Sequence, residues 1–126
     1  MSQLKFDRSS PSIIVTADIK ANYPTDAKLI LDTGASYVTL PRSLISGIGI
    51  PIDPNNTVQL TSASTTETTV KIIVPEITVL GKRIKNVEAI IKDLPPETPA
   101  DGLLGLSFLK HFKLTIDFKK GILELV

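Results

Sequence analysis

Short runs of β-branched and other apolar residues, separated by turn-forming residues, extend along almost the whole chain. Runs of this length bounded by Pro, Gly, Asn or Ser are typical of β-strands. We therefore predict an all-β fold with one short helix near the C-terminus, over Leu103–Phe112, while Pro41–Ile45 is compatible with one further helical turn. The predicted strands are Ser12–Ile19, Ala27–Leu31, Tyr37–Leu40, Thr57–Thr61, Glu67–Val74, Ile77–Leu80, Arg83–Val87, Glu88–Leu94, Lys113–Phe118 and Ile122–Val126.

A weak two-fold pattern runs through this strand arrangement. The segments Ile13–Ile48 and Ile73–Phe112 each contain a strand, a turn, a second strand, a glycine-containing loop and a short helical element. Three strand pairs are separated by short turn-forming stretches and are predicted to be hairpins. Their connections are Ser62–Thr66, Gly81–Lys82 and Lys119–Gly121.

Length and composition fit one domain covering residues 1–126. The formal net charge of +1 gives no electrostatic footprint for nucleic acid or an acidic membrane. The chain has no cysteine and one histidine, His111, which excludes thiol catalysis and multi-histidine metal sites. No apolar run approaches the roughly 20 residues that span a bilayer. No apolar leader follows Met1, so we expect a cytoplasmic protein.

An acid directly follows an apolar strand at Leu31-Asp32-Thr33-Gly34-Ala35-Ser36. A carboxylate at such a strand end must be hydrogen-bonded, paired or functional, because burying it alone is costly. Gly34 permits a sharp turn and a close approach of a ligand to the backbone. The alternative is a strand-to-turn corner in which Asp32 merely caps the turn.

A second motif, Asp101-Gly102-Leu103-Leu104-Gly105, lies far downstream and precedes the predicted helix. Together with Asp32-Thr33-Gly34, the hairpin around Ser62–Thr66 and the closing hairpin Leu114–Val126, it resembles the retropepsin-like aspartic proteases over nearly the whole chain. The resemblance implies an acid-protease barrel with a flap hairpin. It also implies an aspartic endopeptidase that needs neither a cofactor nor a metal.

One Asp-Thr-Gly triplet is present, and Asp101-Gly102 is no second copy because it lacks the intervening hydroxyl residue. The resemblance therefore implies a homodimer in which two Asp32 carboxylates share one proton and activate a water on a polypeptide substrate. Thr33 corresponds to the residue that reaches across the dimer, and Gly34 to the residue whose carbonyl binds the substrate backbone. The flap would comprise Thr61, Ser62, Ala63, Ser64, Thr65 and Thr66, and the second motif would support the site through Leu103, Leu104 and Gly105.

Several residues depart from the family pattern. Ala35 replaces a serine that is usual in pepsin-like enzymes, so a hydroxyl donor to the carboxylate is absent and we expect a pH optimum less acidic than pepsin's. Ser36 and Leu106 replace the ion pair of retroviral proteases, so the dimer must be held otherwise, most simply by strands including Ile122–Val126. The flap tip has no glycine. Candidate walls of the substrate pockets are Val38, Ile48, Ile90 and Leu104, although apolar residues there are more often core.

Two other functions fit the sequence. The first is a catalytically weak or silent dimeric module that binds peptides on the same fold. The second is a non-enzymatic β-barrel in which Asp32 caps a turn. The retained Asp32 and Thr33 argue against the first, and the downstream Leu103-Leu104-Gly105 argues against the second.

Overall fold

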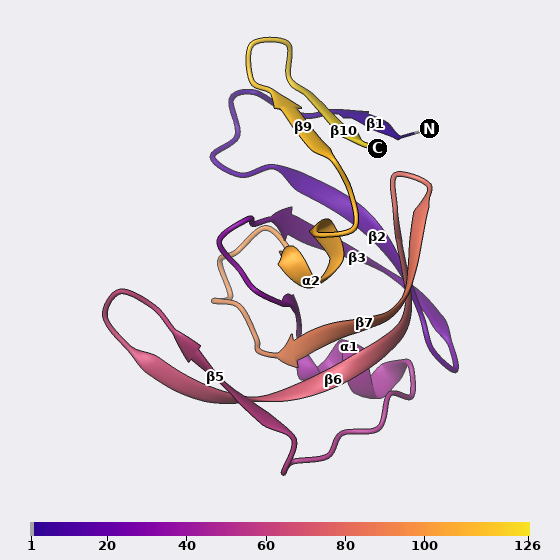
Figure 1. Ribbon diagram of the computed structural model, residues 1–126, viewed down its shortest axis with the longest axis vertical. Coiled ribbons are helices and arrows are strands. Elements are labelled where there is room, and N and C mark those ends of the chain that lie inside the picture. The colour runs from indigo at the N-terminus through magenta and orange to yellow at the C-terminus, as the bar shows by residue number, and fades with distance from the viewer. Residues whose placement is uncertain (1) are drawn as a thin grey trace.

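A computed structural model describes residues 2–126, which form ten strands and two short helices (Figure 1). The predicted all-β class is confirmed. The elements are β1 (Gln3–Lys5), β2 (Ile14–Lys20), β3 (Pro24–Leu31), β4 (Val38–Leu40), α1 (Arg42–Gly47), β5 (Thr57–Thr61), β6 (Thr66–Val79), β7 (Lys82–Ile91), β8 (Gly102–Leu104), α2 (Leu106–Leu109), β9 (Leu114–Asp117) and β10 (Ile122–Leu125).

Six strands close into a barrel in the order β2-β3-β8-β4-β7-β6, because β6 also pairs with β2. Strand β2 is an example of how apolar side chains fill the interior of this barrel. Its residues alternate, so that Val15, Ala17 and Ile19 are buried while the residues between them are exposed. Such alternation places one face of a strand in the core and the other in water. Phe108 of α2 and Leu40 and Val38 of β4 complete the same core.

The barrel contains the predicted two-fold pattern. The first half runs through the hairpin β2–β3, the short strand β4 and α1, and the second half runs through the hairpin β6–β7, the short strand β8 and α2. Each short strand lies parallel to the long strand of the other half, β8 beside β3 and β4 beside β7. The two halves therefore exchange strands at the centre of the barrel, where β4 and β8 also pair with each other.

The predicted helix over Leu103–Phe112 is wrong in its extent. Residues Gly102–Leu104 form β8 beside β3, and the helix is limited to Leu106–Leu109. Pairing with β3 satisfies the backbone of these residues and overrides their local preference for helix. The other helix, α1, extends beyond the single turn that was compatible with Pro41–Ile45, and Pro41 is its N-cap.

Strand boundaries also differ from the expectation around Pro75. Strand β6 continues through Pro75, and the ladder to β7 omits only Pro75 and Asn86. Pro75 has no N–H to donate, and Asn86 adopts a positive φ of 57°, so this one pair is missing from the ladder while the register on either side stays the same. The turn between β6 and β7 is Leu80-Gly81 rather than Gly81-Lys82, and both of its residues have positive φ. Positive φ at both central residues is the requirement of a type I′ turn.

Two structures extend beyond the barrel. The terminal strands form a separate sheet in the order β1-β10-β9, so the two ends of the chain lie side by side at the top of Figure 1. Strands β5 and β6 form a long hairpin that reaches away from the barrel on the left of Figure 1. Neither helix within residues 2–126 is long and apolar enough to cross a membrane.

Candidate active site

Asp32 lies immediately after β3, where the parallel strand β8 fixes its backbone. Its N–H donates to the Leu104 carbonyl at 3.1 Å and continues the pairing of β3 with β8. The chain then turns, with the Ala35 N–H donating to the Asp32 carbonyl at 3.2 Å. The Gly34 N–H donates to Asp32 Oδ1 at 2.9 Å. The half-buried carboxylate is thus held by the backbone of its own loop.

Gly34 lies close beside the Asp32 carboxylate. A Cβ atom at this position would lie 3.2 Å from Asp32 Oδ1, closer than side-chain atoms usually approach. A larger residue would therefore crowd the carboxylate oxygen. The glycine of the triplet keeps the space beside the acid open.

The second motif packs against the backbone of the Asp32 loop through Gly105 and the two residues that follow it. A Cβ atom on Gly105 would collide with the Tyr37 carbonyl oxygen and lie 2.7 Å from the Ala35 oxygen. The next two residues donate backbone hydrogen bonds to the same loop, Leu106 to the Ala35 carbonyl at 2.8 Å and Ser107 to the Ser36 carbonyl at 3.0 Å. Gly105 therefore permits the close backbone approach that shapes the loop.

Ser107 is a supporting residue that the sequence-based predictions do not include. Its hydroxyl is buried, accepts from the Val38 N–H at 2.9 Å and donates to the Glu88 carbonyl at 2.7 Å. It therefore links β4, β7 and the Asp32 loop. The one signal in the sequence is a lone hydroxyl residue within the apolar stretch Leu106-Ser107-Phe108-Leu109.

A cavity of about 520 Å³ opens above Asp32 and below the β5–β6 hairpin. Most of the predicted site residues line it. Thr33, Ala63, Ser64, Thr66, Leu104 and Gly105 do not line it. Thr33 is exposed, whereas Leu104 and Gly105 are buried behind the loop. The cavity is lined by Asp32, Gly34, Ala35, Ser36, Tyr37, Thr39, Gln59, Leu60, Thr61, Ser62, Thr65, Glu67, Ile90, Lys92, Leu94 and Leu103.

The apolar walls differ in part from the expectation. Ile90 lines the cavity as predicted, but Val38, Ile48 and Leu104 belong to the core. In β8 the buried residues are Gly102 and Leu104, so alternation directs Leu103 to the cavity instead.

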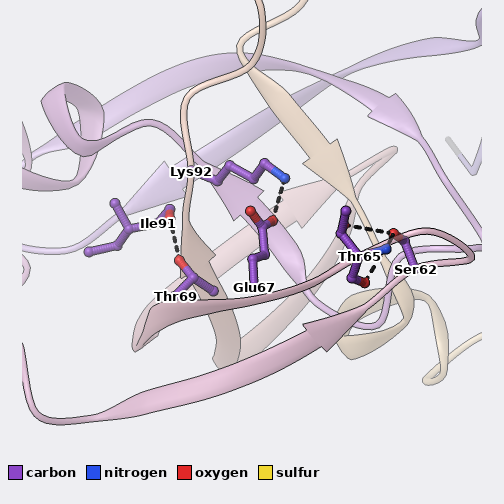
Figure 2. A network of polar contacts seen from close by, with 6 residues as sticks. All are labelled: Ser62, Thr65, Glu67, Thr69, Ile91 and Lys92. Atoms are coloured by element: carbon purple, nitrogen blue, oxygen red, sulfur yellow. Dashed lines mark hydrogen bonds and ion pairs between the residues drawn. The ribbon is translucent and has the colours of Figure 1, made fainter.

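The hairpin tip closes without glycine. The Ser62 N–H donates to the Thr65 carbonyl at 2.8 Å, and the Ser62 hydroxyl lies 3.1 Å from the Thr65 hydroxyl. Two further contacts join the hairpin to the end of β7 (Figure 2). The Thr69 hydroxyl donates to the Ile91 carbonyl at 2.6 Å, and Lys92 Nζ pairs with Glu67 Oε1.

Comparison with known proteins identifies the chain. The sequence model of a family described as "Aspartyl protease" matches residues 15–108, more than half of the chain. The chain belongs to the aspartyl protease family. This aspartyl protease is similar to a crystal structure described as a retropepsin-like aspartic protease from Rickettsia conorii. The TM-score is 0.68 at 23% identity, and the match covers 98% of this chain and 87% of that chain. The predicted retropepsin-like fold is confirmed. A search of curated proteins gave no match.

Two carboxylates of this aspartyl protease that do not line the cavity have shifted pKa values, Asp18 and Glu88. A hydrogen bond with Asp26, desolvation and the charge of Asp26 together raise the pKa of Asp18. A hydrogen bond from Lys71 lowers the pKa of Glu88. Within residues 2–126, no three acidic, histidine or cysteine side chains gather in a way that would hold a metal ion.

Proposed function

We propose that this aspartyl protease is a homodimeric endopeptidase in which two copies of Asp32 form one catalytic pair. The observation that carries the proposal is the position of Asp32. Its carboxylate is held by the Gly34 N–H and lies on the wall of a cavity large enough for a peptide side chain. The chain has one such triplet, so the second carboxylate must come from a second copy.

The proposed chemistry needs only the two acids and a water. At a separation of about 3 Å both carboxylates cannot be ionised, so the pair holds one proton. The ionised Asp32 takes a proton from a water held between the two, and the water oxygen attacks the carbonyl carbon of the scissile bond. The protonated Asp32 polarises the carbonyl oxygen and transfers its proton to it. Collapse of the tetrahedral intermediate then breaks the C–N bond. The amine accepts the proton that the first Asp32 took from the water, and a hydroxyl of the intermediate returns a proton to the second Asp32.

The neighbouring residues fit supporting roles in this proposal. Thr33 is exposed beside the cavity rather than in it, which suits a hydroxyl that bonds to the other copy. The Gly34 carbonyl would accept a hydrogen bond from the substrate backbone. A peptide would bind extended between the Asp32 loop and the β5–β6 hairpin, which would act as a flap that excludes water.

The terminal sheet limits how two copies can meet. Both edges of β10 are already paired within one chain, by β1 and by β9. We therefore infer that Ile122–Val126 contributes to the dimer in another way than by adding a partner strand to β10. The edges that remain unpaired in this sheet are those of β1 and β9.

The test is the Asp32→Asn variant, which keeps the size of the side chain but removes the acid. We expect cleavage of a peptide library to be lost while sedimentation still detects the dimer. Asp53→Asn, which changes a surface carboxylate outside the cavity, is the matched control and should retain cleavage. Cleavage that persists in Asp32→Asn would show that the catalyst is another group. A wild-type protein that binds peptides without cutting them would be a binding module instead.

A further inference from the structure

Two opposite charges form an ion pair in the wall of the cavity. Lys92 Nζ forms an ion pair with Glu67 Oε1, and both residues line the cavity that contains Asp32 (Figure 2). Among the described residues that line this cavity, Lys92 is the one cation. Both side chains are about half exposed, so the pair is accessible to a ligand that enters the cavity.

The two partners are anchored differently. The Lys92 N–H donates to the Leu40 carbonyl at 3.0 Å, which continues the pairing of β7 with β4 and fixes Lys92 to the barrel. Glu67 pairs only with Leu60 of the neighbouring arm of the hairpin. The ladder from β6 to β7 begins at Lys71, four residues further along the chain. Glu67 is therefore attached to the hairpin, whereas Lys92 is attached to the barrel.

An opening of the hairpin would separate this pair. Lys92 would then leave an ammonium group with three N–H donors in the cavity wall, without a carboxylate to accept from it. A peptide that carries an Asp or Glu side chain at this place would supply the missing carboxylate. A Lys or Arg side chain of the peptide would be repelled by the Lys92 ammonium group. The Glu67 carboxylate, which could pair with such a cation, would be too far away in the open hairpin.

We propose that Lys92 forms a subsite for an acidic side chain of the substrate and that Glu67 occupies this subsite when no substrate is bound. The inference rests on the proposed endopeptidase function and names the class of peptide that the enzyme prefers. Lys92 is then a specificity-determining residue, and Glu67 competes with the substrate for it. The neighbouring Ile90 and Leu94 leave the rest of this wall apolar.

The test uses sets of peptides that differ only by Glu, Gln or Lys at one position, scanned along the sequence. At the position that reaches Lys92, we expect kcat/KM to fall in the order Glu, Gln, Lys, by about fivefold per step, as for a half-exposed ion pair. Lys92→Glu should reverse this order. Glu67→Gln should strengthen the preference for Glu, because the competing carboxylate is gone. High salt should weaken the preference in the wild type.

The control is Lys71→Gln, because Lys71 and Glu88 form a comparable ion pair between β6 and β7 at 2.7 Å but line no part of the cavity. This variant should keep the wild-type order of peptides. Equal changes for all three peptides in Glu67→Gln and Lys92→Gln would identify the pair as a fastening of the hairpin and overturn the subsite.

A binding measurement separates this proposal from the endopeptidase itself. Fluorescence anisotropy of the same peptides with Asp32→Asn reports the charge preference without cleavage. Cleavage by the wild type with no charge preference overturns the subsite alone. Preferential binding of Glu peptides that Lys92→Glu reverses, with no cleavage by the wild type, supports the subsite and overturns the endopeptidase.

Discussion

Gly105 lies against the carbonyl groups of the Asp32 loop so closely that no side chain fits between them. The atoms it would meet belong to the backbone of Ala35 and Tyr37, which cannot rotate away as a flexible side chain can. Gly47 at the end of α1 provides a direct contrast, because no neighbouring atom lies within 4 Å of the place that a Cβ atom would take there.

We expect Gly105→Ala to lower the free energy of unfolding by about 3 kcal/mol, because the added methyl group must displace backbone. Gly47→Ala should raise it by about 0.5 kcal/mol, because alanine restricts the unfolded chain in an open helical position. Urea denaturation of the two variants measures both effects. Equal stability of the two variants would contradict the steric role of Gly105.

Ser107→Ala tests the buried hydroxyl that links three segments. Removing it leaves the Val38 N–H and the Glu88 carbonyl without this partner, so the free energy of unfolding should fall by about 2 kcal/mol. Ser46→Ala, at an exposed position in α1, should change it by less than about 0.5 kcal/mol. A loss as small as that of Ser46→Ala would show that the Ser107 hydrogen bonds are replaced by water.

Among individual residues, the sequence identifies those whose interaction partners are close by in the sequence. Asp32 and Gly34 form a turn with each other, so their roles follow from adjacent positions. Ser107 and Lys92 act on partners 19 or more residues away, and no local pattern indicates such contacts. Their roles become visible only when the barrel brings β4, β6 and β7 together.

Residues 57–70 of the β5–β6 hairpin lie outside the ladder that joins β6 to β7. The side-chain polar contacts that join this part of the hairpin to the end of β7 are the ion pair of Glu67 with Lys92 and the hydrogen bond from Thr69 to the Ile91 carbonyl. Segments with few such contacts open more readily than the core does.

Thr69→Val removes the hydroxyl while keeping the branched shape. We expect faster hydrogen exchange in residues 57–70 and a loss of about 1 kcal/mol or less in the free energy of unfolding. Thr68→Val, at an exposed position of the same strand, is the control and should leave exchange unchanged. If Thr69→Val exchanges hydrogen at the wild-type rate, the hairpin is held to β7 by the ion pair of Glu67 and Lys92 rather than by the Thr69 hydroxyl.

Strands β2 and β3 place two carboxylates opposite each other, Asp18 and Asp26. Their hydrogen bond raises the pKa of Asp18, so the folded state binds a proton more readily than the unfolded chain does. This contribution to stability is present at low pH and is lost as the pH rises through the folded-state pKa.

Asp18→Asn should therefore raise the free energy of unfolding at pH 7 by about 0.5 kcal/mol, a small gain because water screens exposed charges. The gain should disappear at low pH, where the Asp18 carboxyl group of the wild type is protonated. Thermal unfolding of wild type and variant across this range measures it. A gain that is independent of pH would exclude charge repulsion as its cause.

Hairpins whose strands are joined by a short run of turn-forming residues can be predicted from the sequence. Strands that form only by pairing with a segment far away in the sequence cannot. The hairpin that ends in β10 follows from Lys119-Lys120-Gly121, where Gly121 has a φ of 70°. The helix predicted over β8 is wrong because these three residues are strand only beside β3. The sequence does not indicate strand β1, because its pairing partner β10 is more than 100 positions away in the sequence.

The whole molecule repeats one arrangement of elements twice, and the exchange of β4 and β8 joins the two halves into one barrel. The sequence indicates this repeat through the order of its elements. It does not indicate the closure of the barrel, which depends on the pairing of β2 with β6.

A mixing experiment tests the proposed pairing of two molecules. If each site takes one Asp32 from each copy, random exchange with an equal amount of Asp32→Asn should leave about one quarter of the activity, because only wild-type pairs are complete. A fall to about one half would mean that each copy works alone. The measurement is peptide cleavage after subunit exchange at a fixed total concentration.

The terminal sheet has a consequence for the order of events during synthesis. Strand β1 is synthesised before all the barrel strands, whereas its strand partner β10 is synthesised after them, with Gln3 and Glu124 separated by 121 positions. The barrel strands β2 to β8 can pair while translation continues. Strand β1 cannot pair with β10 until Leu125 has emerged, so the terminal sheet forms later than the barrel strands can.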